Sequence, residues 1–245
     1  MKTLGIIPAR FQSSRFPGKP LIDIAGKSMI QRVYEQCQKS TKLDKVIVAT
    51  DDQRIMEHLQ SFGAEGIMTN SNHISGTDRC GEVASKYPEF DILVNIQGDE
   101  PMIDPSQIDL LCSCFDKSET QIATLVKIIG SDEELFNENT PKVILNNKQE
   151  ALYFSRQTIP FLRGKQSNSW LKEHTFYKHI GIYGFRNKSL SEIIKLPQSS
   201  LELAESLEQL RWIENGYSIQ CAITDKESQA IDTPADLEKL LNILN

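Results

Sequence analysis

Residues 3–20, TLGIIPARFQSSRFPGKP, join a short apolar run to a basic loop. The run at residues 3–8 is apolar without polar alternation, which is typical of a strand buried on both faces of a sheet. The loop after it carries Arg10, Arg15 and Lys19 and no acidic residue, and its Pro-Gly pair imposes a turn. A buried strand followed by such a loop is the first unit of a predicted α/β fold.

Similar apolar runs recur through the first half of the chain and alternate with helical patterns. Further strands are predicted at residues 45–50, 91–97 and 121–128, and helices at residues 28–39, 52–62, 78–86 and 105–115. This alternation predicts βαβ units and a mainly parallel (mixed) sheet flanked by helices. Ligands of such sheets bind at the carboxyl ends of the strands, so the residues after each strand are candidates for a site.

The second half of the chain is less regular. It contains strand-like runs at residues 142–145, 151–155, 180–185 and 219–223, a polar stretch at 163–172, a helical pattern at 200–215 and a closing helix from Pro234. No repeat or Pro/Gly/Ser-rich linker divides the sequence. We therefore expect one domain over residues 1–245, with a smaller extension on the substrate side.

The charge of the chain limits the class of its ligands. The 245 residues include 27 Lys and Arg against 33 Asp and Glu, for a net charge of −6. An acidic total argues against a broad nucleic-acid-binding or anionic-membrane surface, because those partners require a basic face. It leaves room for a local basic pocket that holds a small anion.

The apolar runs and the cysteines indicate the cellular compartment of the protein. No apolar run approaches the ~18 residues of a membrane span, and the first apolar stretch meets Arg10 too early for a signal peptide. The five cysteines contain no C-x-x-C pair, and the four histidines form no metal-ligand cluster. These features predict a reduced, cytoplasmic protein without a disulfide framework or structural zinc.

The basic loop after the first strand favours phosphate binding. A loop with three cations at a strand end, in an acidic protein, is better explained as a polyphosphate site than as a loop that is only solvated. Arg10, Arg15 and Lys19 are therefore candidate phosphate ligands. The tripeptide GKS at residues 26–28 resembles the end of a P-loop, but Leu21 stands where its first glycine is required. Its serine is better explained as a helix N-cap. A G-x-G-x-x-G fingerprint after a strand is also missing.

Two acidic residues are candidate magnesium ligands. Asp99 lies in NIQGDEPMI, residues 95–103, directly after a predicted buried strand, although acids there also serve as turn formers and helix caps. Asp232 precedes the last helix, where Thr233 and Asp236 form a predicted capping box that leaves Asp232 without a structural task. The spacing permits a metal pair of Asp99 and Asp232 without showing it.

Other polar segments carry weaker signals. SGTDR at residues 75–79 is typical of a helix N-terminus that could contact an anion. Arg156 and His179 fit structural roles at least as well as ligand roles. Glu208 and Gln209 fit ordinary exposed positions of the helix at 200–215, which a stripe of Leu203, Leu207 and Leu210 marks as mainly a packing helix.

The chain resembles the 3-deoxy-manno-octulosonate cytidylyltransferases in a series of segments that follow the same order along nearly its whole length. These segments are IIPARFQSSRFPGKPL, VATDD, SGTDR, NIQGDEPMI, ALYFSRQTIP, KHIGIYGFR, LEQLR and IDTPADLE. The resemblance implies a Rossmann-like nucleotidyltransferase fold and transfer of CMP from CTP to the anomeric hydroxyl of the sugar acid Kdo (3-deoxy-manno-octulosonate). It also implies release of pyrophosphate, a Mg²⁺ cofactor, a homodimer, and a product used in lipopolysaccharide assembly.

The same resemblance implies residue roles. It places at the nucleotide Pro8, Ala9, Arg10, Arg15, Lys19, Ser75, Gly76 and Thr77. It places around the sugar acid Gln97, Arg156, Arg163, His179, Tyr183, Glu208 and Gln209. The implied catalytic residues are Arg10, Lys19, Asp99 and Asp232, of which the two aspartates hold the metal. The sequence departs from the family pattern at Ser28, at Asp78 and around residues 163–172, the stretch that contains Arg163.

Two alternatives remain open at this point. The acid acceptor could instead be a sialic acid or the 8-amino analogue of Kdo, since a single side chain can decide one terminal substituent. The chain could also be a catalytically silent sugar-nucleotide sensor on the same fold. The presence of Asp99, Asp232 and all three loop cations argues against the sensor.

Overall fold

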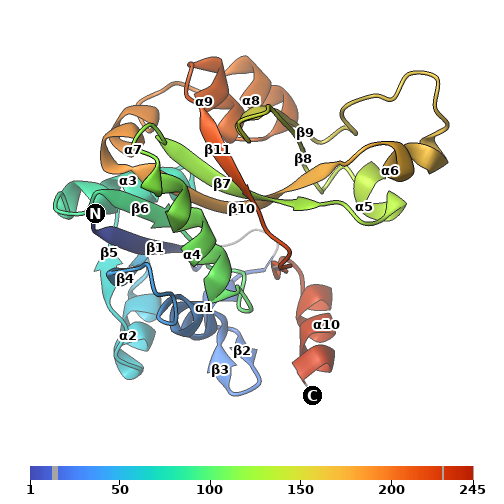
Figure 1. Ribbon diagram of the computed structural model, residues 1–245. Helices are drawn as coiled ribbons and strands as arrows, with labels where there is room; N and C mark the ends of the chain where they lie inside the picture. Colours follow the sequence, from blue (N-terminus) through green and yellow to red (C-terminus); the bar gives the residue numbers. More distant parts are fainter. Residues whose placement is uncertain (13–15, 228, 245) are drawn as a thin grey trace.

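The computed structural model describes residues 1–12, 16–227 and 229–244. Within them, a nine-stranded sheet has the order β11-β7-β10-β6-β1-β4-β5, and the hairpin of β8 and β9 pairs with β10 (Figure 1). The strands are β1 Thr3–Ala9, β4 Lys45–Thr50, β5 Gly66–Met68, β6 Ile92–Asn95, β7 Ile122–Ile128, β8 Lys142–Leu145, β9 Ala151–Ser155, β10 Tyr177–Arg186 and β11 Ile219–Ile223. A separate small hairpin consists of β2 Asp23–Ile24 and β3 Lys27–Ser28.

The helices are α1 Met29–Cys37, α2 Gln53–Ser61, α3 Gly76–Lys86, α4 Pro105–Ser113, α5 Asp132–Phe136, α6 Trp170–Glu173, α7 Asn187–Ile193, α8 Ser200–Glu205, α9 Gln209–Glu214 and α10 Pro234–Leu244. The predicted cap at Ser28 is confirmed, because its hydroxyl accepts from the Gln31 amide. The Thr233–Asp236 box is confirmed as well. None of the helices in the described ranges has the length and apolar character that a membrane span requires.

The sheet confirms the predicted α/β class and is mixed. Parallel pairing joins β1 to β4 and β6, β4 to β5, and β7 to β11. β10 is antiparallel to both β6 and β7 and lies between them. The central strands read as continuous apolar runs because helices cover both faces: every residue of β6 is buried, as are five of the six in β4.

The predicted single helix at residues 200–215 is wrong. The chain forms α8 and α9 with a break at Ser206, whose φ of 52° is left-handed. Leu203 is 62% exposed, whereas Leu207 and Leu210 are buried, so the predicted leucine stripe does not lie on one face. The break places Glu208 at the N-terminus of α9.

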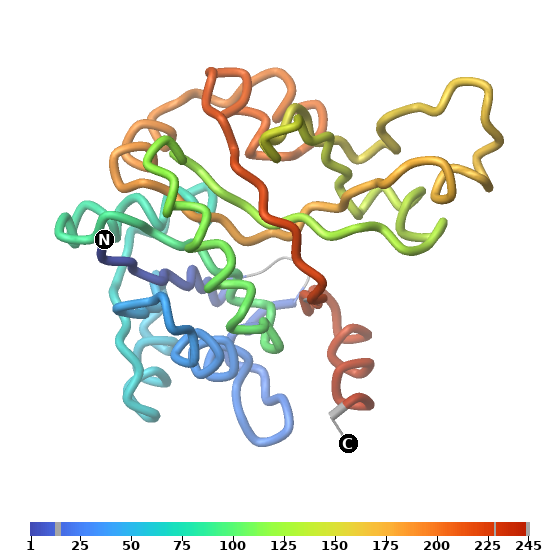
Figure 2. The backbone as a smooth tube through the Cα atoms, in the orientation of Figure 1, coloured from blue at the N-terminus to red at the C-terminus, as the bar shows by residue number. Residues whose placement is uncertain are grey.

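An extension formed by α5, β8, β9, α6 and the first half of β10 projects from one end of the sheet (Figures 1 and 2). The polar stretch at residues 163–172 belongs to it and is more structured than the sequence suggested. It contains a short 3₁₀ turn at Ser167–Ser169 and α6. Trp170 is buried there with Leu135 and Phe176 in a small core of its own.

The C-terminal segment returns to the first loop of the chain. After β11, residues 224–233 lead to α10, and Ile231 and Leu240 pack with Ile24 and Met29 in a separate small core. This return crosses the molecule from the β11 edge toward α1 (Figure 2). It brings Asp232 beside Lys19, in the loop after β1.

All five cysteines are buried and free. Burial raises the pKa of the Cys112 and Cys221 thiols to about 12 and that of Cys114 to about 11. Because only a thiolate reacts readily, native protein at pH 8 is expected to leave all five thiols unlabelled by a disulfide reagent over minutes. Unfolded protein should label five, which an absorbance assay counts; rapid labelling of any native thiol would contradict the burial.

Candidate active site

The loop after β6 meets the end of β1 at Pro8. A Cβ atom placed on Gly98 would lie 2.7 Å from the Pro8 carbonyl oxygen, so only glycine allows this approach of backbone to backbone. Gly76, the first residue of α3, contacts the same proline, because its Cβ position lies 3.5 Å from Pro8 Cγ. Three segments that sequence analysis selected therefore converge at the carboxyl ends of β1 and β6.

Lys19 joins the two predicted metal ligands. Its Nζ atom donates to Asp99 Oδ2 at 2.6 Å and to Asp232 Oδ1 at 3.2 Å, and its side chain is 14% exposed. The left-handed Gly18, with φ of 74°, begins the 3₁₀ turn that aims Lys19 at the two acids. The Ile231 amide donates to the Asp99 carbonyl at 2.9 Å and fixes the C-terminal segment there. Asp99 and Asp232, which are far apart in the sequence, thus lie against one ammonium group.

The carboxylate pair fits a hard divalent cation. Two carboxylates that share one ammonium group already point at a common cation position. No group of three or more His, Cys, Asp or Glu with a metal-binding arrangement occurs in the described part of the chain. Two protein carboxylates with the remaining positions left to ligand oxygens and water match the coordination of Mg²⁺ better than that of zinc.

Arg10 lies between β1 and the loop before α3. Its guanidinium donates to the carbonyls of His73 and Ser75 and lines a pocket of about 230 Å³ with Gln12, Asp51, Asp52 and Ser71. Burial and the nearby Arg79 lower the pKa of Arg10, since both disfavour its charge. Because Arg10 is partly buried and its charge is disfavoured there, an anionic ligand would stabilise it. Arg15 lies outside the described residues.

The α3 N-terminus is a capping box as well as a predicted nucleotide contact. Ser75 accepts from the Asp78 amide, and the Asp78 carboxylate accepts from the Ser75 amide. Thr77 donates to Glu208 Oε2 at 2.7 Å. The nucleotide-side and sugar-side predictions are thus in direct contact through Thr77 and Glu208.

Several residues predicted at the sugar acid form one cluster on β10 and α9. The ring of His179 lies 5.2 Å from that of Tyr183, which in turn lies 5.0 Å from Trp212. Gln97 donates to the Gly181 carbonyl at 2.9 Å. Burial raises the pKa of Glu208 and raises that of Tyr183 well above its usual value, while it lowers the pKa of His179 to about 3.

Three buried polar atoms near this cluster have no partner in the described residues: Asn95 Oδ1, Tyr183 Oη and Gln209 Nε2. Buried polar groups are rarely left without hydrogen bonds, so unpaired atoms around one site favour a polar ligand. Asn95 stands opposite Tyr183 in the β6–β10 register and was missed by the sequence analysis. The sequence feature that could have marked Asn95 as a site residue is its place as a polar residue at the end of a buried strand.

The two remaining predicted arginines stand apart. Arg156 donates to the carbonyls of Glu138, Glu205 and Ser206, so it clamps the end of α8 to the extension. Arg163 is exposed in the loop before α6 and has no hydrogen-bond or ion-pair partner in the described ranges. The structure brings neither into contact with the other predicted sugar residues.

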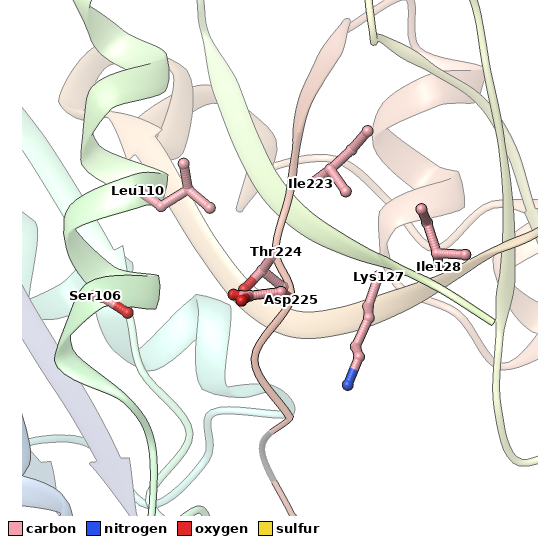
Figure 3. A pocket seen from close by; sticks show the side chains of 7 residues that line it. All are labelled: Ser106, Leu110, Lys127, Ile128, Ile223, Thr224 and Asp225. Carbon is pink, nitrogen blue, oxygen red and sulfur yellow. The ribbon is translucent and has the colours of Figure 1, made fainter. Parts of the chain in front are cut away.

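A second hollow of about 610 Å³ lies between α4 and the ends of β7 and β11 (Figure 3). Leu110, Ile128 and Ile223 make its wall largely apolar, and Lys127 and Asp225 lie at its rim. None of the residues predicted for the nucleotide or the sugar acid lines it. Its largely apolar wall suits an apolar group better than a triphosphate, so it is not part of the candidate site.

The geometry agrees with the comparisons with known proteins. A cytidylyltransferase family model matches residues 4–223. A 3-deoxy-manno-octulosonate cytidylyltransferase of Parabacteroides distasonis is 58% identical over all of this chain and 98% of its own length. A 3-deoxy-manno-octulosonate cytidylyltransferase of Bacteroides thetaiotaomicron is 57% identical over 97% of this chain and 96% of its own length. A solved structure of a CMP:2-keto-3-deoxy-manno-octonic acid synthetase complexed with CTP is 44% identical, with a TM-score of 0.93. The match covers 100% of this chain and 98% of that one.

Proposed function

The chain belongs to the cytidylyltransferase family, and on that premise we propose how its residues activate a sugar acid. The reaction is CTP + Kdo → CMP-Kdo + pyrophosphate, as in the relatives that match the whole chain. One observation carries the assignment at the level of the site: Lys19 lies in contact with Asp99 and Asp232 beside the end of β1. The product supplies lipopolysaccharide assembly.

The nucleotide is proposed to bind along the basic loop and the start of α3. Arg10, Arg15 and Lys19 would contact the phosphates, with Pro8 and Ala9 at the end of β1 supporting them. What supports this is the partly buried charge of Arg10 and its hydrogen bond to the Ser75 carbonyl, which ties both segments together. Ser75, Gly76 and Thr77 would approach the nucleotide through the backbone, since the Ser75 hydroxyl caps α3.

Asp99 and Asp232 are proposed to hold Mg²⁺. When bound, the ion would neutralise charge on the phosphate oxygens and polarise the α-phosphate. The Lys19 ammonium neutralises both carboxylates in this structure and would turn to a phosphate once they hold the ion. The support for this proposal is the shared cation position of the two acids and their hard oxygen ligands.

The sugar acid is proposed to bind over β10 and the start of α9. Glu208 would accept from sugar hydroxyls, Gln97 and Gln209 would offer amides, and Tyr183, which stays protonated, would donate. His179 stays neutral because burial lowers its pKa to about 3. The unpaired buried atoms of Tyr183 and Gln209 support this placement. Roles for Arg156 and Arg163 at the sugar carboxylate remain predictions.

Transfer needs little covalent work by the protein. The anomeric hydroxyl of Kdo attacks the α-phosphorus in line and loses its proton to solvent while pyrophosphate leaves, so catalysis consists of positioning and charge stabilisation. Arg10 and Lys19 would hold the departing pyrophosphate charge. The hydrogen bond from Thr77 to Glu208 would link the two proposed substrate subsites.

We also propose a cytoplasmic homodimer. Buried free cysteines suit a reducing compartment. Exposed apolar side chains on and near the extension support self-association, with Phe161 being 74% exposed and Leu152 and Leu203 also exposed. Light scattering coupled to size exclusion tests the dimer: a mass near twice 27.7 kDa supports it, and a monomer at micromolar concentration contradicts it.

Pyrophosphate release tests the activity. Protein with CTP, Kdo and Mg²⁺ is expected to release pyrophosphate and form CMP-Kdo, and neither EDTA-treated reactions nor mixtures without Kdo should do so. UTP, ATP and GTP in place of CTP give the nucleotide preference. Binding of CTP and Kdo without any release would instead support the silent sensor.

Glu208→Gln is expected to weaken binding of the sugar acid without loss of stability. A raised pKa means that ionising this carboxyl costs the folded state free energy, and that cost fades as the pH falls toward the ordinary glutamate value of about 4.5. The variant should therefore melt at an equal or higher temperature at pH 7, with the difference lost near pH 4.5. The KM for Kdo should rise roughly tenfold, the effect of one charged hydrogen bond. A normal KM would remove Glu208 from the site.

A further inference from the structure

A bulge in β10 turns two carbonyl oxygens toward one buried hydroxyl. The β10–β7 register shifts between Ile180 and Tyr183. At that point Thr124 Oγ1 lies 2.8 Å from the Ile182 carbonyl oxygen and 3.2 Å from that of Ile180. Thr124 is completely buried on β7. Its third polar neighbour is His179 Nε2, at 3.0 Å.

The hydrogen count at Thr124 decides the roles. A threonine hydroxyl has one hydrogen and two lone pairs, whereas a carbonyl oxygen can only accept. If the hydrogen went to His179, the hydroxyl oxygen would face the Ile182 carbonyl at 2.8 Å with no hydrogen between them. The hydrogen therefore goes to a backbone carbonyl, and the lone pair left on Thr124 requires a donor at His179 Nε2.

We propose that Thr124 is a positioning residue that fixes His179 in the Nε2-protonated tautomer and so presents Nδ1 as a hydrogen-bond acceptor for the sugar acid. Second partners commonly set a histidine tautomer in this way. No partner for Nδ1 occurs in the described part of the chain. The specificity that follows is for a substrate hydroxyl, which donates, over a group that can only accept.

The surroundings of His179 keep this acceptor available. The ring is partly buried, packs edge-on against Phe154 at 5.3 Å, and lies beside Tyr183. Its backbone amide donates to the Pro141 carbonyl at 2.9 Å, which fixes the strand position. Burial lowers the pKa of His179 to about 3, so the imidazole stays neutral and Nδ1 stays unprotonated at physiological pH. The sugar contact itself rests on the proposed function; the tautomer does not.

Nitrogen-15 NMR of histidine-labelled protein tests the tautomer directly. The chain has four histidines, and the spectrum of His179→Gln identifies the signal of His179 by its loss. Wild type and Thr124→Ser are expected to show the Nε2-protonated form, because serine keeps the hydroxyl. Thr124→Val, which matches threonine in shape, should lose that form or mix it with the other tautomer. The signals of His58, His73 and His174 serve as internal controls and should stay unchanged.

Kinetics provide the second readout. Thr124→Val should raise the KM for Kdo by roughly tenfold with the KM for CTP unchanged, and Thr124→Ser should restore it. An Nδ1-protonated His179 in the wild type, or a tautomer unmoved in Thr124→Val, would overturn the proposal. If Thr124→Val fails to fold, the spectra of the wild type and of Thr124→Ser still decide whether His179 is the Nε2-protonated tautomer. Absence of turnover with Kdo would defeat the proposed function alone, because the tautomer is read without substrate.

Discussion

Asp99→Asn is expected to lower kcat/KM for CMP-Kdo formation by about 10²–10³-fold, the range typical of losing one group that stabilises transition-state charge. The substitution keeps the size of the side chain but removes the charge that Lys19 contacts at 2.6 Å. Because a neutral amide is a poor Mg²⁺ ligand, the Mg²⁺ concentration for half-maximal rate should also rise. Pyrophosphate release over a Mg²⁺ titration measures both effects.

Thermal unfolding separates this effect from misfolding. The loss of one partly exposed ion pair costs only ~1 kcal/mol or less, so the melting temperature of Asp99→Asn without ligand should change little. The rise in melting temperature that CTP and Mg²⁺ produce together in the wild type should largely disappear. Asp116→Asn, at an exposed acid in the turn after α4, is the matched control and should behave as wild type. Unchanged Mg²⁺ dependence in Asp99→Asn would refute the metal assignment.

Gly98→Ala is expected to reduce activity about 10²-fold and to destabilise the fold as well. The added Cβ would lie 2.7 Å from the Pro8 carbonyl oxygen, and backbone cannot rotate away as a side chain can. The loop that carries Asp99 must then shift relative to β1, and a shift of about 1 Å is enough for a 10²-fold loss. Overpacking of this kind costs ~1–3 kcal/mol, which is roughly 2–10 °C in melting temperature for a chain of this size.

Gly130→Ala is the control for that substitution. A Cβ at Gly130 meets no atom within 4 Å, and its backbone is not left-handed, so alanine there should be neutral or slightly stabilising. The comparison isolates the contact with Pro8 from the general effect of replacing glycine. Equal activity and melting temperature in the two variants would show that the approach of the loops to each other is not needed.

The parallel part of the fold was predictable because burial on both faces leaves a continuous apolar run in the sequence. β4 and β6 show this most clearly. β5 has three residues, none fully buried, and gave no such signal. The break between α8 and α9 was not predicted because the left-handed residue there is Ser206 and not glycine, the usual sequence signal of this conformation. The leucine spacing therefore predicted one continuous helix.

The nucleotide side of the site was predictable from strand ends, whereas the sugar side was not. Lys19 and Asp99 follow β1 and β6 in the sequence, and neighbouring parallel strands bring their ends together. Asp232 reaches them only because the chain returns from β11 to the first loop, which no local pattern encodes. Asn95 and Thr124 read as ordinary strand residues, because their roles depend on register with β10.

The central claim is that Kdo is the acid that this chain activates. Steady-state pyrophosphate release with CTP and Mg²⁺, compared across Kdo, its 8-amino analogue and a sialic acid, tests it most directly. We expect the highest kcat/KM with Kdo, with CMP-Kdo identified by mass spectrometry as the product. Turnover of the sialic acid or of the 8-amino analogue in clear preference to Kdo would contradict the account.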